Sequence, residues 1–329
     1  MDEPIISVII AVRDAERTIE ESLESVLGQT FPDLEVIIVD DGSVDRTGEI
    51  VRQIAARDRR IELLHQEKRG LATSLNRAIA VARGRYVARQ DGDDVSMPER
   101  LDRQLCRLEA DTTLAALGTA AAVIDDAGRP IGRFPTAHGT AAVRDGLRTM
   151  RTTPVHGSMM LRRERLVAVG GYREAFTASQ DFDLWLRLLE QSEIDNLEEP
   201  LYRWRVTTGS VYGRQRRLQL QCTGLARTFA HERRLRGVDS YPLLERCSGG
   251  LEGFAAQYAL RGRLYAYWGE LMLRGLNDPS AARMYLGRAI RAGYLRPRAV
   301  GLLAWSLLGL SWPGGRPLAL PARPPAAGN

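Results

Sequence analysis

Residues 5–47 read IISVIIAVRDAERTIEESLESVLGQTFPDLEVIIVDDGSVDRT, and the order of apolar and polar residues in this stretch indicates the fold. The run 5–12 is almost wholly apolar and rich in β-branched side chains, which is typical of a strand buried on both faces. Residues 14–29 place apolar side chains at helical intervals, and 34–39 form a second buried strand that ends at Asp40. The stretch therefore predicts a strand, a helix and a second strand.

The same alternation continues along the chain. Helices are predicted over 46–60 and 71–82, and strands over 61–64 and 86–89. Strands that alternate with helices are joined by right-handed crossovers, and they form a parallel sheet with helices on both faces. The predicted fold class is therefore α/β, with a mostly parallel sheet flanked by helices.

Further elements are predicted after this repeat. Ser96 can cap a helix, and Glu99 can complete a capping box at its first turn. Four further segments have the residue pattern of strands, and one has the apolar spacing of a helix. The strands are expected over 114–124, 131–134, 158–161 and 201–205, and the helix over 182–189.

From residue 214 onward the pattern is almost wholly helical. Residues 261–293 resemble one helix-turn-helix of the tetratricopeptide kind, and one such pair cannot form a solenoid. We therefore predict a catalytic domain over 1–213 and a helical C-terminal annex over 214–312. Residues 313–329 are rich in Pro, Gly and Ala and are predicted to form a disordered tail.

The net charge of +5 hides an asymmetry between the two halves of the chain. Residues 214–329 contain 18 arginines and 6 acidic residues, a net of +12, whereas 1–213 contain 28 basic and 35 acidic residues, a net of −7. One interpretation is a basic region that contacts anionic lipid or an anionic acceptor. The other is a surface rich in solvated arginine.

The start of the sequence, its apolar runs and its cysteines favour a cytoplasmic protein. The acidic start has no basic segment or cleavage site of a signal peptide, and no apolar run of about 18 residues predicts a membrane-spanning helix. Cys106, Cys222 and Cys247 are an odd, widely spaced set, which disfavours a disulfide framework or a zinc ribbon. A peripheral position at the inner face of the membrane is the alternative location.

Two acidic clusters follow predicted strands. Asp40 and Asp41 come after the second strand, and Asp91, Asp93 and Asp94 come after the fourth. Ligands of parallel sheets bind beyond the carboxyl ends of the strands, so both clusters are expected at one rim. Carboxylates after the second strand can accept hydrogen bonds from a nucleobase edge or a ribose. Helix caps and Asx turns are the structural alternative for both clusters.

The sequence after the first strand lacks the glycine-rich loop that holds phosphates in dinucleotide-binding folds. Bound phosphates would then be neutralised in another way, and a metal held by carboxylates is the natural candidate. Mg²⁺ and Mn²⁺ take one or two protein carboxylates and complete their shell with phosphate oxygens and water. The run 91–94 supplies such carboxylates.

Several blocks, in order over about 210 residues, resemble the family 2 glycosyltransferases, and this order is far more specific than any single motif. The blocks are SVIIAVRDAERTIEESLESVLGQ (7–29) with VDDGSVDRT (39–47), GLATSLNRAI (70–79), GRYVARQDGDD (84–94), GGY (170–172) with QDFDLW (180–185), and YRWR (202–205) with Gly209-Ser210.

The resemblance implies a GT-A fold and an inverting transfer from a nucleoside-diphosphate sugar to a hydroxyl acceptor, with Mn²⁺ or Mg²⁺ as the cofactor. Matched by position, Asp40 would contact the base or ribose of the nucleotide, and Asp91 would lie near the ribose. Asp93 would ligate the metal. Asp181 would be the general base that takes the acceptor proton. Arg205 would lie near the diphosphate or the acceptor.

The sequence departs from the family pattern at three places. Residues 11–14 replace the usual Pro-x-Tyr-Asn-like turn, which bears on recognition of the base. Gln180 replaces an acidic residue, and Thr207 stands where many relatives carry a histidine. For His156 an acceptor pocket competes with a structural role, and for Trp204 sugar stacking competes with a core position.

Two other functions stay open at this point. The first is a degenerate transferase that binds a nucleotide-sugar without turning it over. The second is an interaction protein whose basic helical region contacts a membrane. A nucleic-acid partner is not expected, because no nucleic-acid-binding module is visible and the first half of the chain is acidic.

Overall fold

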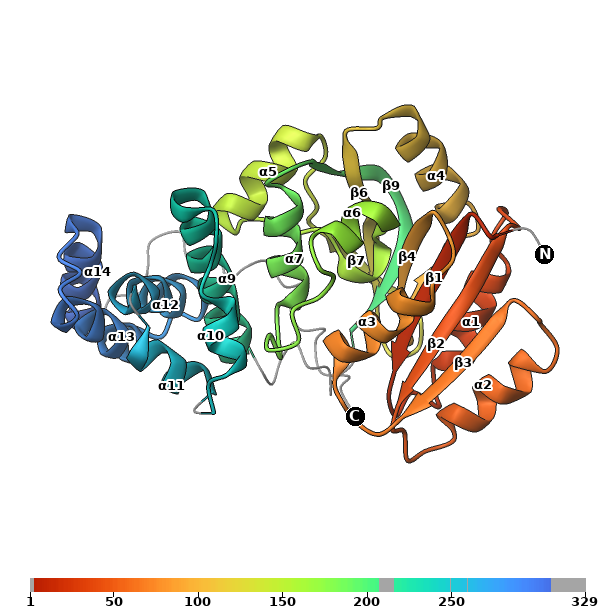
Figure 1. The fold of residues 1–329 in the computed structure, drawn as a ribbon, viewed down its shortest axis with the longest axis horizontal. Coiled ribbons are helices and arrows are strands. Elements are labelled where there is room, and N and C mark those ends of the chain that lie inside the picture. Colours follow the sequence, from red (N-terminus) through yellow and green to blue (C-terminus); the bar gives the residue numbers. More distant parts are fainter. Residues whose placement is uncertain (1–2, 207–215, 249, 259, 309–329) are drawn as a thin grey trace. The chain divides into compact units, whose positions relative to one another are not determined.

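The structure is a computed structural model, shown in Figure 1, that describes residues 3–206, 216–248, 250–258 and 260–308. The described residues form two compact units. The first contains residues up to 173 together with 187–206, and the second contains 174–186 together with the described residues after 215. No helix among these residues combines the length and apolar character needed to cross a bilayer.

The first unit contains a nine-stranded sheet in the order β3-β2-β1-β4-β8-β6-β9-β5, with β7 paired to β6. Strands β3, β2, β1 and β4 run parallel, β8 is antiparallel to β4 and β6, and β9 is parallel to β6. The strands are β1 (Ile6–Val12), β2 (Leu34–Asp41), β3 (Ile61–Gln66), β4 (Tyr86–Asp91), β5 (Val95–Ser96), β6 (Leu114–Ile124), β7 (Pro130–Phe134), β8 (Met160–Arg162) and β9 (Glu193–Arg205).

Helices cover both faces of the parallel part of the sheet. On one face, alternate side chains of β1 such as Val8 and Ile10 share a buried core with α1, α2 and α4. On the other face, α3 packs against β1 and β2. The helices of this unit are α1 (Ile19–Leu27), α2 (Thr47–Ala55), α3 (Leu71–Val81), α4 (Arg100–Ala110), α5 (Thr140–Thr149) and α6 (Arg163–Ala168). The predicted α/β fold, with a mostly parallel sheet flanked by helices, is confirmed.

The predicted capping box is wrong. Ser96 lies in β5, which pairs with β9, and its hydroxyl donates to Gln90 Oε1 at 2.7 Å. Helix α4 begins only at Arg100, and Glu99 at its N-cap makes no side-chain capping hydrogen bond. Pairing with a strand about a hundred residues away along the chain was invisible to the local pattern. Helices α5 and α6 were not predicted either.

The second unit is helical, as predicted for the C-terminal region. Its helices are α7 (Gln180–Leu188), whose last residues belong to the first unit, α9 (Arg216–Arg236), α10 (Tyr241–Glu245), α11 (Gly250–Gln257), α12 (Arg261–Gly275), α13 (Pro279–Arg291) and α14 (Pro297–Leu307). Helices α12 and α13 form the predicted pair. Asp278 caps α13 by accepting from Ala281 N at 2.9 Å.

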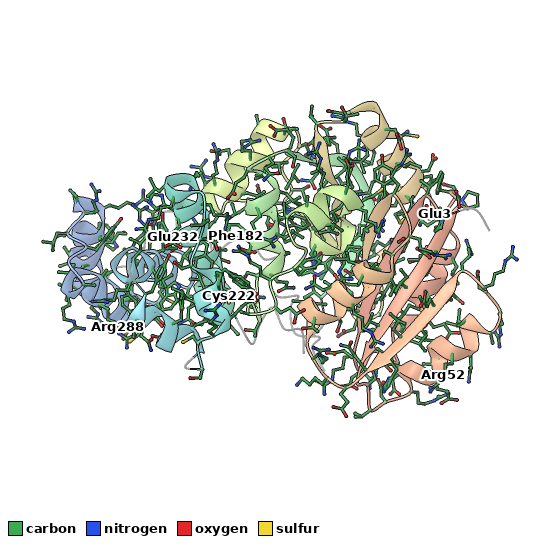
Figure 2. The ribbon with its side chains drawn as sticks, in the orientation of Figure 1. Glu3, Arg52, Phe182, Cys222, Glu232 and Arg288 are labelled. Atoms are coloured by element: carbon green, nitrogen blue, oxygen red, sulfur yellow. The ribbon has the colours of Figure 1, made fainter. Side chains whose placement is uncertain are left out.

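Helix α9 has buried side chains along its length, among them Cys222 and Glu232, which Figure 2 labels. Cys222 is buried on it, and Glu232 is buried where it accepts hydrogen bonds from the amide and hydroxyl of Ser240. The indole of Trp268 donates to Gln221 O at 2.8 Å. Thr207, Gly209-Ser210 and the predicted disordered tail lie outside the described residues.

Candidate functional site

The acidic residues after β2 and β4 lie at one edge of the sheet because β1 runs between these two strands. In the register of the sheet, Asp40 lies opposite Val12 at the end of β1. On the other side of β1, Asp91 lies opposite Ala11. The common rim predicted for the two clusters is therefore present in the first unit.

Asp40 lies against a cavity at this rim. Its side chain is buried, Oδ1 accepts from Ser43 N at 2.9 Å, and Oδ2 lies 3.2 Å from Nδ1 of His65. A cavity of about 430 Å³ is lined by Asp40, His65, the β2–α2 turn and the first turns of α2. A Cβ at Gly48 would lie 2.9 Å from Asp40 Oδ2, so a glycine is needed for α2 to approach this carboxylate.

Asp41 organises the next loop. Oδ1 accepts from Gln66 Nε2 and from Arg69 N, both at 2.7 Å, and Oδ2 accepts from Gly70 N at 2.8 Å. Burial by itself would raise the pKa of Asp41, but these donors outweigh it and hold the pKa below its usual value. Asp41 thereby fixes the turn between β3 and α3, where Gly70 has a φ of +94°.

Two fully buried arginines lie beneath Asp91, and neither was predicted as a site residue. Arg89 donates from Nη2 to Asp91 Oδ1 at 2.5 Å. Arg100 donates to the backbone oxygens of Arg89 and Gly157. Burial and the neighbouring charge of Arg89 lower the pKa of Arg100 to about 10. These cations offset part of the negative charge that gathers at the rim.

Asp93 and Asp94 place two carboxyl groups in poorly solvated positions. Burial, together with the charge of Asp91, raises the pKa of Asp93 to about 6. Burial, together with the charges of Asp91 and Asp93, raises the pKa of Asp94 well above its usual value. Asp94 Oδ1 accepts from Arg205 N at 2.7 Å, whereas Oδ2 is buried with no hydrogen-bond partner among the described residues. The arrangement favours a proton or a cation beside these carboxylates.

The residues at the rim fit a divalent cation that is shared with a ligand. The described part of the chain contains no group of three or more His, Cys, Asp or Glu side chains arranged to hold a metal. Mg²⁺ and Mn²⁺ need only one or two carboxylates when phosphate oxygens and water complete the shell. Burial and neighbouring carboxylates disfavour the ionised forms of Asp93 and Asp94, so a cation beside either of them would be favoured.

Asp181 lies in the second compact unit, whereas Asp40, Asp91 and Asp93 lie in the first. It stands in the first turn of α7, directly after Ser179 and Gln180. Ser179 has a φ of +53°, and its hydroxyl donates to Gln219 O at 3.0 Å, which ties this helix start to α9. The role of Asp181 as general base stays a prediction.

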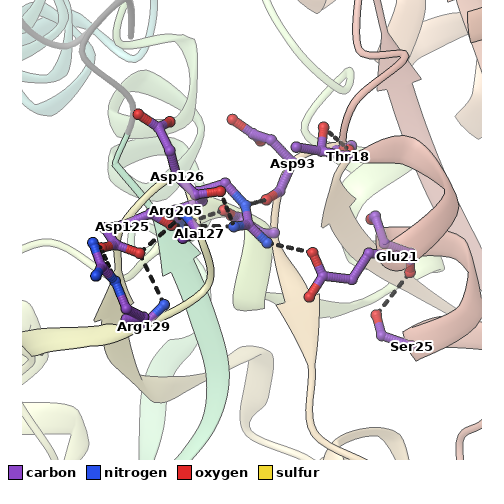
Figure 3. Close-up of polar contacts among 12 residues, drawn as sticks. Thr18, Glu21, Ser25, Asp93, Asp125, Asp126, Ala127, Arg129 and Arg205 are labelled. Atoms are coloured by element: carbon purple, nitrogen blue, oxygen red, sulfur yellow. Dashed lines mark hydrogen bonds and ion pairs between the residues drawn. The ribbon is translucent and has the colours of Figure 1, made fainter.

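Arg205 ends β9, and its side chain is only 3% exposed. Nε donates to the backbone oxygen of Asp93 at 2.7 Å. Nη1 donates to the backbone oxygens of Asp125 and Asp126, each at 3.1 Å, and Nη2 donates to Glu21 Oε2 at 2.5 Å (Figure 3). All three guanidinium nitrogens thus have protein acceptors. The predicted contact with a diphosphate or an acceptor stays a prediction.

Two residues with open alternatives have structural partners. His156 Nε2 lies 2.7 Å from the hydroxyl of Tyr172, and burial together with the charge of Arg89 lowers the pKa of His156 to about 3. Trp204 packs edge-to-face against Phe134, with ring centroids 5.2 Å apart. Both arrangements support the structural alternative.

Comparisons with known proteins find glycosyltransferases among the similar sequences. The sequence profile of the family described as Glycosyl transferase family 2 matches residues 7–168. EpsE of Bacillus subtilis, named as a glycosyltransferase, is 37% identical over 207 residues, which cover 61% of this chain and 73% of EpsE. The chain belongs to glycosyl transferase family 2. The O-antigen biosynthesis glycosyltransferase WbnJ of Escherichia coli is 31% identical over 216 residues, which cover 63% of this family 2 chain and 82% of WbnJ.

Solved structures confirm the GT-A fold of this glycosyltransferase. The mannosyltransferase PcManGT of Pyrobaculum calidifontis, in complex with GDP-Man and Mn²⁺, matches with a TM-score of 0.55 and 22% identity over 96% of this chain and 83% of its own. Residues 1–349 of S. aureus TarS, in complex with UDP-GlcNAc, match with a TM-score of 0.58 and 18% identity over 92% of this chain and 90% of their own. Asp181 and Arg205 lie beyond the segment that matches the family profile.

Proposed function

We propose that this chain is an inverting glycosyltransferase that moves a sugar from a nucleoside-diphosphate sugar to a hydroxyl acceptor in polysaccharide or glycolipid synthesis. The observation that carries the proposal is the rim where Asp40 and Asp91 flank the end of β1, with Asp93 beside them. Membership of family 2 and the names of the relatives support it. WbnJ acts in O-antigen biosynthesis, and the similar structures contain GDP-Man or UDP-GlcNAc.

The roles of the rim residues follow from their chemistry. Asp40, buried against the cavity, accepts hydrogen bonds from the nucleobase or ribose, and Asp91, held by Arg89, lies near the ribose. Asp41 serves nucleotide binding by holding the adjacent turn. Asp93 would hold Mn²⁺ or Mg²⁺, and such an ion would stabilise the charge of the departing diphosphate.

The proposed transfer is a single displacement. An acceptor hydroxyl oxygen forms a bond to the anomeric carbon while the bond from that carbon to the diphosphate oxygen breaks. The bonding electrons leave with the nucleoside diphosphate, and the acceptor proton passes to Asp181. The sugar has oxocarbenium character at the transition state, and the configuration at its anomeric carbon is inverted.

A turnover assay tests the proposal. The protein is incubated with UDP- and GDP-sugars, Mn²⁺ and a panel of saccharide and lipid acceptors, and release of UDP or GDP is measured. We expect acceptor-dependent release and a product of inverted anomeric configuration by NMR. Retained configuration would exclude the single displacement. Binding of a nucleotide-sugar without turnover under any condition would favour the degenerate transferase instead.

The helical unit supports a second proposal about where the enzyme works. Residues 279–308 contain five arginines and no acidic residue, and two of these arginines, Arg288 and Arg298, pair with Glu252 of α11 and Glu270 of α12. Helix α14 buries Ala299 and Leu302 yet leaves Val300 and Leu307 44% and 62% exposed on another side. We propose that this basic, apolar surface contacts anionic lipid, so that the enzyme works in the cytoplasm at the inner face of the membrane.

Vesicle sedimentation tests this location. We expect binding to phosphatidylglycerol vesicles that weakens as salt rises, and little binding to phosphatidylcholine vesicles. The double variant Val300→Ser with Leu307→Ser should bind less than a variant at the exposed Val44 of the first unit. Equal binding to both kinds of vesicle would contradict the proposal.

A further inference from the structure

Arg205 connects three segments of the first unit that are far apart in the sequence. The first is α1, and the second is the stretch 91–94, which is called the acidic loop below. The third is the β6–β7 turn (125–129). Its guanidinium donates to Glu21 of α1, to a backbone oxygen of the acidic loop and to two backbone oxygens of the turn (Figure 3). A buried cation is costly unless its donors are satisfied. The folded position of Arg205 at the end of β9 therefore depends on all of these contacts.

Helix α1 holds the acidic loop from the other side. Thr18 donates to Gly92 O at 3.0 Å, and Ser22 donates to Asp91 O at 2.8 Å. Ser25 accepts from Ser96 N at 3.1 Å, just beyond the loop. Residues at positions 18, 22 and 25 lie on one face of a helix, and Glu21 belongs to the same face. Glu21 therefore joins the α1 contacts to the Arg205 contacts.

The β6–β7 turn offers Arg205 a fixed pair of acceptors. Asp125 Oδ1 accepts from the amides of Ala127 and Arg129, and Oδ2 accepts from the Arg129 side chain at 2.8 Å. Gly128 closes the turn with a φ of +78°, which favours glycine. Since the turn is closed by its own contacts, its backbone oxygens form a firm support for the guanidinium.

We infer that Arg205 is a positioning residue, anchored by Glu21 and by the β6–β7 turn, that sets the place of the Asp93 carboxylate through the backbone of the acidic loop. This role differs from a direct contact with the diphosphate, because such a contact would take the guanidinium away from acceptors that it already has. The consequence for binding rests on the proposed function of Asp93, whereas the ordering of the loop does not.

Glu21 offers the cleanest test, because it is 54% exposed and because the other three acceptors of Arg205 are backbone oxygens that a substitution does not remove. Hydrogen–deuterium exchange is measured on peptides covering 91–96 and 124–129 in the protein without ligand. Glu21→Ala should speed exchange about three- to tenfold in both peptides, in line with the loss of one partly exposed charge-assisted hydrogen bond. Glu20→Ala, an exposed neighbour on the same helix, should not.

Glu21→Gln is the conservative variant, since its amide oxygen can still accept from Nη2. It should return exchange most of the way to the wild-type rate. Unchanged exchange in Glu21→Ala, or the same change in Glu20→Ala, would overturn the inference. Arg205→Lys keeps the charge but cannot reach four acceptors, so exchange in both peptides should rise more than in Glu21→Ala.

A binding measurement links the loop to the site. Thermal stabilisation by UDP or GDP is followed as MnCl₂ is raised, and Glu21→Ala should need about three- to tenfold more Mn²⁺ for half of the effect. Unchanged exchange in Glu21→Ala together with an unaltered Mn²⁺ requirement would show that the contact between Arg205 and Glu21 does not position the acidic loop. If neither nucleotide stabilises the wild type, the proposed function fails, and the exchange comparison still decides whether Arg205 orders the loop.

Discussion

Gly157→Ala perturbs the rim through one methyl group. A Cβ at Gly157 would lie 2.1 Å from the hydroxyl oxygen of Tyr202 and 2.7 Å from Asp91 Oδ2, well inside van der Waals contact. Tyr202 is fully buried, whereas the Asp91 side chain is 32% exposed. Both groups have to give way, and because Asp91 N donates to the Tyr202 hydroxyl at 3.2 Å, either movement displaces Asp91.

The expected magnitude follows from this overlap. Overpacking of a well-packed site costs about 1–3 kcal/mol of unfolding free energy. Displacement of a binding group by about 1 Å can cost on the order of a hundredfold in rate. We expect Gly157→Ala to lose at least about tenfold in UDP or GDP affinity with Mn²⁺ present, because only one of the rim carboxylates is displaced.

The assay compares two alanine variants. Urea unfolding gives the free energy of unfolding, and calorimetric titration with UDP and GDP gives the affinity. Gly132→Ala on β7 is the control, because a Cβ there meets nothing within 4 Å. Equal nucleotide affinity in Gly157→Ala and Gly132→Ala would refute the claim that Asp91 takes part in binding.

Three further predictions concern other parts of the chain. Asp41→Asn should lower the free energy of unfolding by about 1–3 kcal/mol above pH 4. Because the pKa of Asp41 is lowered in the folded protein, this difference should shrink as the pH falls below 4 and passes through that pKa. Urea titrations at several pH values measure it. Gly269→Ala should destabilise the helical unit by about 1–3 kcal/mol, since its Cβ would lie 2.5 Å from Leu286 Cγ. Gly287→Ala should not, because its Cβ would meet nothing within 4 Å, and unfolding followed by helical circular dichroism compares the two variants. Asp181→Asn should keep nucleotide-sugar binding and lose transfer, and full activity in that variant would remove Asp181 as the base.

The parallel part of the fold could be predicted because its strands are buried on both faces. Strands β1 and β2 have almost no exposed side chain, so they read as continuous apolar runs between amphipathic helices. Once the strands are parallel and adjacent, Asp40 and Asp91 must share an edge. The register of β1 with β2 and β4 confirms this placement.

The support beneath the rim could not be predicted, because it depends on contacts across long sequence separations. Arg89 reads as the end of a strand, yet Arg100 and Asp91 hold it in full burial. Arg205 matched a motif of the family, but the pattern contains no information about its acceptors at 21 and 125–126. The local pattern of apolar and polar residues does not predict partners that lie far apart in the sequence.

The most direct measurement is a thermal-shift comparison of the wild type and Asp93→Ala with UDP- and GDP-sugars, with and without Mn²⁺. Asp33→Ala is the control, since Asp33 is exposed just before β2, at the opposite edge of the sheet. Ligand at a hundred times its Kd stabilises by about 2.7 kcal/mol, which gives a shift of a few degrees. We predict that one nucleotide-sugar with Mn²⁺ stabilises the wild type and Asp33→Ala and fails to stabilise Asp93→Ala. Equal stabilisation without Mn²⁺, or in Asp93→Ala, would contradict a metal-assisted nucleotide site at this rim.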